Sequence, residues 1–291
     1  MIRVLRLFAG ILLATIIAVP ALAGSPALWR LSDDDSEIWL FGTVHLLPPG
    51  LQWRSPAFEA AFAAADTVYV ETDVSPEAAD GLGPLIKQLG LNANYKTLTS
   101  MLGPADSERL ASAASHLGIP LASLEPMRPW FASIQLTLIH VARQGYDPRS
   151  GVDATIIADA IAAGKRLRYF ETARQQLEIF AALSPEAEKV FLMASIDQIE
   201  TDTDFLDKMV RSWATGDTKT LDTLMKEATG AGLPEINDAV FVKRNRTWAE
   251  HIARTMTGSG MALVAVGTGH LSGEQGLVAM LRNKGYTVTR Q

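Results

Sequence analysis

Two segments near opposite ends of the chain share one pattern, a short apolar β-type run followed by Gly-Thr-x-His-Leu. They occupy residues 39–46 and 264–271. Two other β-rich runs both end in Glu-Thr, at Glu71 and at Glu171. Helix-type sequence lies between these runs. This alternation predicts an α/β fold in which a central sheet, mainly parallel or mixed, is flanked by helices.

Propensity and capping signals place the remaining elements. The sequence predicts an opening hairpin at residues 27–31 and 37–41, strands at 67–70, 167–170, 261–266 and 286–289, and helices at 55–65, 129–143, 151–163, 184–215, 235–256 and 274–284. No linker rich in Pro, Gly or Ser marks a domain boundary. Residues 24–291 are therefore expected to form one α/β domain with a helical insertion at about 185–256.

The first residues have the features of a secretory signal peptide. Arg3 and Arg6 precede an apolar run over residues 7–23, which ends in Ala-Leu-Ala before Gly24. This pattern predicts cleavage before Gly24 and a periplasmic or secreted protein. An uncleaved membrane anchor is the alternative, but the run of 17 residues is shorter than the about 20 that span a bilayer. No later segment is apolar over such a length, so we expect no stable membrane insertion after cleavage.

Charge and cysteine content exclude several kinds of partner and site. The formal charge of −6 becomes −8 after cleavage, because Arg3 and Arg6 are lost and residues 1–23 contain no acidic residue. This acidity argues against nucleic acid as a partner. The chain contains no cysteine, which excludes disulfides, thiol nucleophiles and thiolate metal sites. Any metal would have to be bound by His, Asp or Glu.

The four similar strand ends predict a shared site. In a parallel sheet the carboxyl ends of the strands face one crevice, and ligands bind there. If the four strands are neighbours, His45, His270, Glu71 and Glu171 lie on one rim. Imidazoles and carboxylates are ligands of catalytic divalent metals, and a free glutamate is a suitable general base. His45 and His270 are the candidate metal ligands, and Glu71 is a candidate ligand or base.

Other residues near these motifs have weaker claims. Thr43 and Thr268 are candidates for hydrogen bonds to a ligand histidine or to substrate. Glu171 could instead cap the next helix or pair with an arginine. Residues 244–246 are predicted to form a solvated helix face, from which Arg244 could reach a site glutamate. The remaining histidines lie in helical segments without partners at metal-ligand spacing and are expected to be structural; they are His116, His140 and His251.

Several familiar catalytic motifs are absent from the sequence. It contains no H-E-x-x-H, no G-x-S-x-G and no Walker loop. The glycine-rich segment 267–273 imitates a dinucleotide-binding turn, but its third glycine is one residue late. Only 18 residues follow it, too few for the rest of such a unit. Nicotinamide binding is therefore not expected.

At these residues the chain resembles the TraB/GumN family, which is related to the animal Tiki metalloproteases. The landmarks occur in family order and cover nearly the whole mature chain: residues 39–48, Trp53, Pro56, Glu71, 129–130, 151–153, 171–172, Gln176, Trp213, 216–217, 244–245 and 267–270. Phe170 departs from the pattern, which has an aliphatic residue there, with no chemical consequence. The resemblance implies a fold shared with the erythromycin-esterase and ChaN-like group.

The same resemblance implies an activity. By similarity to the Tiki proteins, it suggests a divalent-metal-dependent hydrolase that acts as a peptidase, with manganese or cobalt as cofactor. Zinc is a third ion that histidine and glutamate ligands accept. His45 and His270 carry over as metal ligands, and Glu71 as ligand or base. The substrate would be a peptide or another small molecule. The alternative is a non-catalytic periplasmic protein that binds haem, a metal or a peptide through the same histidines.

Overall fold

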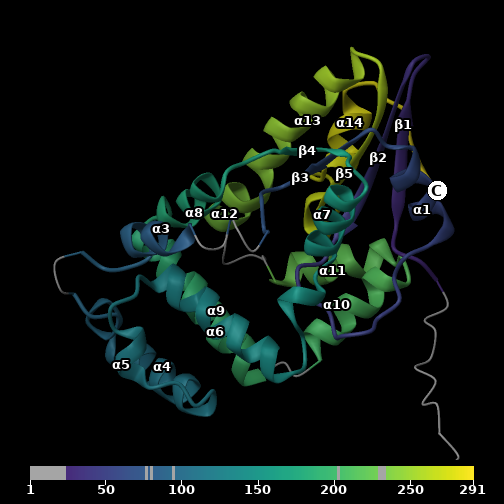
Figure 1. The fold of residues 1–291 in the computed structure, drawn as a ribbon. Coiled ribbons are helices and arrows are strands. Elements are labelled where there is room, and N and C mark those ends of the chain that lie inside the picture. The colour runs from purple at the N-terminus through teal and green to yellow at the C-terminus, as the bar shows by residue number, and fades with distance from the viewer. Residues whose placement is uncertain (1–23, 76–77, 79–80, 94–95, 202–203, 229–233) are drawn as a thin grey trace, which may run out of the picture.

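The computed structural model describes residues 24–291, with gaps at 76–77, 79–80, 94–95, 202–203 and 229–233 (Figure 1). The predicted signal peptide, residues 1–23, lies outside the described residues. None of the described helices is both long enough and apolar enough to cross a membrane.

A six-stranded mixed sheet forms the centre of the fold, so the predicted α/β class is confirmed. Its strands are β1 (Leu28–Ser32), β2 (Ser36–Thr43), β3 (Thr67–Val70), β4 (Arg166–Tyr169), β5 (Gly260–Gly267) and β6 (Val288–Arg290). Their order across the sheet is β4-β3-β5-β2-β1-β6. The first four of these are parallel, whereas β1 runs antiparallel to both of its neighbours. The predicted opening hairpin is β1–β2.

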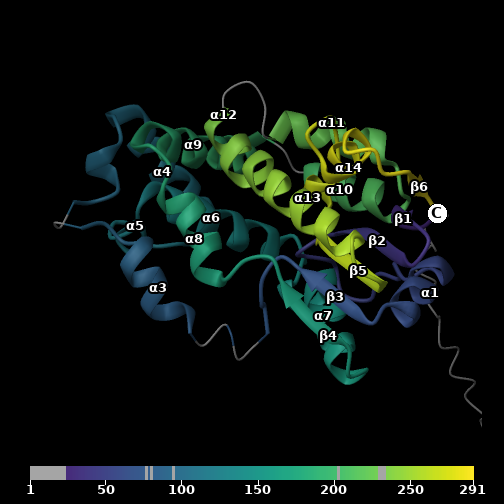
Figure 2. The same ribbon diagram turned by 90° about the horizontal axis from the view of Figure 1, so that it is seen from above.

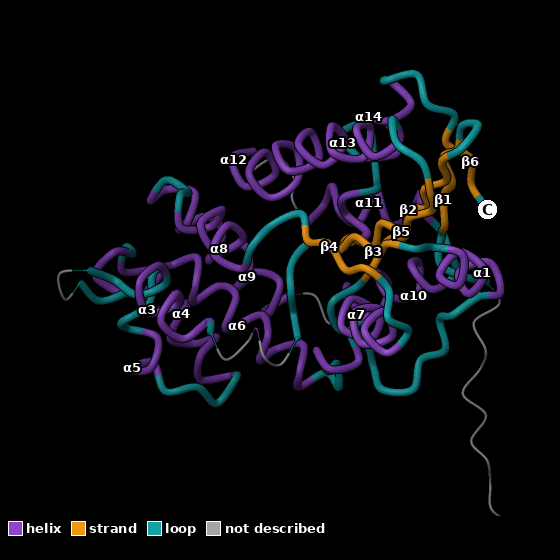
Figure 3. The backbone as a smooth tube through the Cα atoms, turned by 45° about the horizontal axis from the view of Figure 1, so that its top comes forward, coloured by secondary structure: helices purple, strands orange, loops and turns teal. Residues whose placement is uncertain are grey.

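Helices cover both faces of the sheet (Figure 3). One face carries α1 (Pro56–Ala64), α7 (Val152–Ala162), α10 (Phe205–Ala214) and α11 (Thr218–Ala228). The other carries α13 (Lys243–Met256) and α14 (Leu277–Asn283). Burial on both faces explains why β5 is a continuous apolar run: Ala262 to Gly267 are all buried.

A second helical layer extends away from the strand ends (Figure 1). It contains α3 (Leu82–Leu89), α4 (Pro104–His116), α5 (Leu121–Leu124), α6 (Pro129–Arg143), α8 (Ala173–Ala181) and α9 (Pro185–Thr201). Of these, α4, α5, α6 and α9 share a hydrophobic core of their own, separate from the two cores against the sheet. Short 3-10 turns are η1 (Thr99–Met101), η2 (Pro148–Ser150) and η4 (Thr268–His270).

Two long predicted helices have a more complex structure than expected. The helix predicted at 184–215 is two helices, α9 and α10, because α10 begins afresh after Asp204. The helix predicted at 235–256 is α12 (Pro234–Asn237), a π-helical turn η3 (Asp238–Val242) and α13. Figure 2 shows α12 and α13 running as one long path toward the sheet.

Candidate functional site

The four parallel strands that carry the repeated motifs are neighbours, and their carboxyl ends meet. The order β4-β3-β5-β2 places Glu171, Glu71, His270 and His45 at the same edge, as the sequence predicted. Gly267, which ends β5, lies at the point of convergence. A Cβ atom at this position would be 3.1 Å from Glu71 Oε1, 3.5 Å from His45 Nε2 and 3.7 Å from His270 Cδ2.

His45 is fixed by a carboxylate on α7. Its Nδ1 lies 2.8 Å from Asp153 Oδ2, and Thr43 Oγ1 donates to Asp153 Oδ1 at 2.6 Å. Because the carboxylate holds the Nδ1 proton, Nε2 is the nitrogen that can bind a ligand once the ring has lost its second proton. The charge of Asp153 raises the pKa of His45 to about 9, although burial opposes this. The side chain is nevertheless 65% exposed, which weakens that attraction by solvent screening.

His270 is buried and is held through an amide. Its Nδ1 lies 2.6 Å from Asn245 Oδ1, while Asn245 Nδ2 donates to the Gln275 carbonyl oxygen at 2.8 Å. Burial lowers the pKa of His270 to about 3, so the ring is neutral at pH 7. Its Nε2 lies 3.6 Å from Glu71 Oε1.

Glu71 is a firmly held anion. Its Oε1 accepts the Gly267 N–H at 2.7 Å, and its Oε2 accepts from Arg244 Nη2 at 2.6 Å and from Gln176 Nε2 at 3.1 Å. Burial alone would raise the pKa of Glu71, but the nearby His270, Arg244 and His45 and the Gly267 N–H lower it to about 2. Since His270 is neutral at pH 7, Arg244 and the protonated His45 are the cations beside this carboxylate.

Arg244 joins both glutamates, which corrects the predicted solvated helix face. Its Nε and Nη2 donate to the two oxygens of Glu171 at 2.8 to 3.1 Å, in addition to the bond with Glu71. The guanidinium also lies over the Trp248 ring, 4.5 Å from its centroid. The next residue, Asn245, is 1% exposed, and only Arg246 of the predicted face is exposed.

Local helix structure explains how these side chains reach the strand ends. Glu171 immediately precedes α8, which begins with a capping box between Thr172 and Gln175, so Gln176 follows within the first turn. Arg244 and Asn245 come directly after the π-helical turn η3, a feature often found at functional sites. The Val240 carbonyl in η3 accepts from Arg244 Nη1 at 3.0 Å, which fixes the guanidinium further.

The other predicted residues lie beside the site or outside it. Thr268 is buried and packs closely against β2: a Cβ atom at Gly42 would lie 2.8 Å from Thr268 Oγ1. That close approach explains the first glycine of the repeated motif. His251 packs edge-on against the rings of Tyr69 and Phe170. His116 and His140 also lie outside the site, as expected.

A cavity of about 420 Å³ opens over the strand ends. The polar residues described above form one side of it, including His45, Glu71, Gln176, Arg244 and His270. The remaining lining is mostly apolar and comes from α8, α10, α11 and η3. Charged and polar side chains therefore line one side of the cavity, and apolar side chains line most of the rest.

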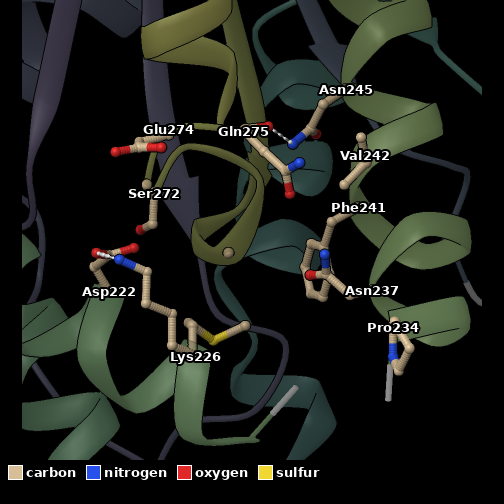
Figure 4. Close-up of a pocket in the computed structure, with 13 residues that line it drawn as sticks. Asp222, Lys226, Pro234, Asn237, Phe241, Val242, Asn245, Ser272, Glu274 and Gln275 are labelled. Atoms are coloured by element: carbon tan, nitrogen blue, oxygen red, sulfur yellow. Dashed lines mark hydrogen bonds and ion pairs between the residues drawn. The ribbon is translucent and has the colours of Figure 1, made fainter. Parts of the chain in front are cut away.

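A second cavity of about 590 Å³ is lined by Asn245, Gly269 and Gln275 among others, and Figure 4 shows the residues that line it. Asn245 forms part of this lining while it holds His270 Nδ1. Gly269, Met225 and Phe241 line both cavities and so form the wall between them. A Cβ atom at Gly269 would lie 2.7 Å from Met225 Cε and 2.8 Å from Phe241 Cε1, so a larger residue would have to push these two side chains aside.

A family model matches residues 27–290 of the chain, and it describes the TraB/PrgY/gumN family. The chain belongs to the TraB/PrgY/gumN family. Searches among curated proteins and among solved structures gave no match. The family thus covers nearly the whole described chain, and the strand-end motifs lie inside the matched range.

In this TraB/PrgY/gumN member, the site is completed by three residues. The sequence motifs alone did not identify them. They are Asp153, which holds His45; Asn245, which holds His270; and Gln176, which binds Glu71. All three lie in segments that resemble the family: 151–153, 244–245 and Gln176. This resemblance was the one signal in the sequence that could have identified them. Their roles depend on contacts across 25 to 108 positions of sequence, which no local pattern shows.

Proposed function

We propose that this TraB/PrgY/gumN member is a divalent-metal-dependent hydrolase that acts on peptide bonds. One observation carries the proposal: both motif histidines are fixed through Nδ1 by an oxygen partner, and Nε2 of His270 lies 3.6 Å from Glu71 Oε1. Ligand histidines in metal enzymes are oriented in this way by a carboxylate or carbonyl on the second nitrogen.

The donor set fits a divalent ion chemically. Two imidazole nitrogens and one carboxylate, from His45, His270 and Glu71, are ligands that manganese, cobalt and zinc accept. Within the part of the chain that the structure describes, no group of three or more His, Asp or Glu side chains is arranged to hold a metal ion as it stands. Arg244 is bound to two of the three proposed ligands, since its Nη1 is 3.0 Å from His270 Nε2 and its Nη2 binds Glu71. An ion at these atoms has to displace those hydrogen bonds.

The chain's own groups have distinct parts in the proposed reaction. A bound divalent ion would polarise the scissile carbonyl and lower the pKa of water. Glu71, with its pKa lowered to about 2, is a better anionic ligand than proton acceptor, so ligand is the role we propose for it. Arg244, once released from Glu71, remains paired with Glu171 and provides a fixed positive charge beside the substrate.

The first experiment measures the metal content of the purified mature protein by mass spectrometry, together with cleavage of a peptide library. The double variant His45→Ala, His270→Ala is compared with His116→Ala, His140→Ala, which removes two histidines outside the site. We expect near-stoichiometric metal and hydrolysis in the wild type and in the control, and loss of both in the site variant. Unchanged metal-dependent hydrolysis in the site variant would overturn the proposal.

A non-catalytic binding protein is the second candidate. The apolar lining of the 420 Å³ cavity favours it, because such a space beside two histidines suits haem or a retained peptide. Haem binding through His45 predicts a Soret band that is lost in His45→Ala. Recovery of an intact peptide from a tight complex would instead identify a peptide-binding protein.

We also propose export, with cleavage before Gly24. The support is the Arg3 and Arg6 start, the apolar run and the Ala-Leu-Ala end of residues 1–23. Cell fractionation with N-terminal sequencing of the recovered protein tests it. A protein found in the cytoplasm with residues 1–23 intact would contradict the proposal.

A further inference from the structure

The 420 Å³ cavity has a defined apolar part, which we call the apolar chamber. Its side chains come from three separate helical segments: Ile179 and Phe180 of α8, Leu206 and Met209 of α10, and Val240 and Phe241 of η3. All six are only partly buried, so their surfaces face the cavity or solvent. Concave apolar surface that the described residues leave uncovered is typical of a ligand site.

The chamber and the strand-end groups belong to one cavity. Phe241 links them directly, because its ring centroid is 5.1 Å from that of His270. The same η3 turn that carries Val240 and Phe241 leads into Arg244, which binds Glu71 and Glu171. A ligand group in the chamber is therefore next to the groups that would act on it.

The size of the chamber indicates what it accepts. An apolar cavity of about 150 Å³ holds a benzene ring, so a cavity of about 420 Å³ has room for a large side chain together with part of a peptide backbone. A polar side chain would lose its hydration there, because the six chamber residues offer no side-chain hydrogen-bonding group.

We propose that the apolar chamber is a specificity pocket for a bulky apolar side chain, aromatic or branched aliphatic, next to the bond that is cleaved. This inference rests on the proposed peptidase function. It names the substrate class of the same site.

The test compares peptides that differ at one residue. A set of blocked tetrapeptides carries Phe, Leu, Gly, Asp or Lys at each position in turn, and kcat/KM is measured for each. We expect Phe and Leu to exceed Gly and the charged residues at one position by on the order of tenfold or more. Leu206→Lys places a charge in the chamber and should remove this preference, whereas Leu138→Lys, at an exposed position outside the cavity, should keep it.

A second measurement separates this inference from the proposed hydrolysis. Titration calorimetry follows binding of N-acetyl-phenylalanine amide, N-acetyl-glycine amide and decanoate to the wild type, to Leu206→Lys and to the milder Leu206→Ala. The proposed pocket is supported if the phenylalanine compound binds, the glycine compound and decanoate do not, and both variants bind the phenylalanine compound more weakly. This support holds even if no peptide is cleaved. Equal cleavage of Gly and Phe peptides, or binding of decanoate without the phenylalanine compound, would overturn the proposal.

Discussion

Nη1 of Arg244 lies 3.0 Å from Nε2 of His270. A guanidinium donates hydrogen bonds and never accepts them, so this nitrogen of the imidazole must carry its lone pair. The proton of the neutral ring is then on Nδ1, where Asn245 Oδ1 accepts it at 2.6 Å. The two contacts fix the tautomer of His270 as the one that a metal ligand needs at Nε2, while Arg244 occupies that lone pair.

The first prediction concerns this competition. Arg244→Gln should raise the affinity for manganese, cobalt or zinc by at least about tenfold, because a unit charge near a divalent ion at an effective dielectric of 20 costs more than 1.4 kcal/mol. Equilibrium dialysis with mass spectrometry measures it, and circular dichroism checks folding. Arg246→Gln, an exposed arginine on the same helix, is the control and should leave affinity unchanged. Weaker binding in Arg244→Gln would show that Arg244 helps to build the metal site.

The second prediction concerns His45. Asp153→Asn should move the pKa of His45 down from about 9 toward 6.5, because the Coulomb attraction of the carboxylate is its main cause. Titration of the imidazole Cε1–H signal by NMR in metal-free protein measures the change. Asp159→Asn, on the same helix but paired with Arg54, should leave the His45 titration as it is. An unchanged His45 pKa in Asp153→Asn would show that the ion pair with Asp153 does not raise it.

The third prediction concerns stability in mild acid. The pKa of His270 is about 3 in the folded protein against 6.5 as its ordinary value, so below pH 6.5 the unfolded chain takes up a proton that the folded chain does not. Folding stability is therefore lost as the pH falls from 6.5 toward 3. Glu71, with a folded pKa of about 2 against 4.5, adds a loss only below pH 4.5. Stability from His45, whose pKa is raised, is fully present below 6.5.

The window from pH 6.5 to 5 thus isolates His270 among these three groups. His270→Gln should lose less stability across this window than the wild type, by on the order of 1 kcal/mol. Urea unfolding of metal-free protein at each pH measures the difference. The pKa values of His140 and His251 are also lowered, but both proteins share those residues, so their effects cancel. Equal pH slopes in the two proteins would mean that His270 is not held neutral.

The fourth prediction concerns the glycine at the convergence point. In Gly267→Ala the new Cβ would lie 3.1 Å from Glu71 Oε1 and 3.5 Å from His45 Nε2, so the carboxylate has to shift. Metal binding and hydrolysis should fall by at least about tenfold, while stability falls by only about 1–3 kcal/mol, as for other overpacked sites. Gly83→Ala, where no atom lies within 4 Å of a new Cβ, is the matched control. Full activity in Gly267→Ala would argue against a site at this point.

The strands and their chemistry were largely predictable from the sequence. The repeated Gly-Thr-x-His-Leu motif and the two Glu-Thr ends predicted four strands, which would share one edge if they were neighbours, and the sheet order β4-β3-β5-β2 makes them neighbours. This succeeded because strand propensity and the direction of the chain are local properties, and parallel strands necessarily end at the same side. Helix α6 was predicted with the bounds it has, Pro129–Arg143, because a proline begins it and apolar residues recur along it.

Only the tertiary structure decided which side chains meet across the site. Arg244, 173 positions from Glu71 and 73 from Glu171, was expected on a solvated helix face with a site glutamate within possible reach, and the fold brings it to both glutamates. The pairing of His45 with Asp153 likewise depends on how α7 packs against β3, β4 and β5. The sequence by itself determined the local elements and the residue types at their ends. The contacts between distant elements, and with them the charge state of each group, were fixed by packing, which no single segment encodes.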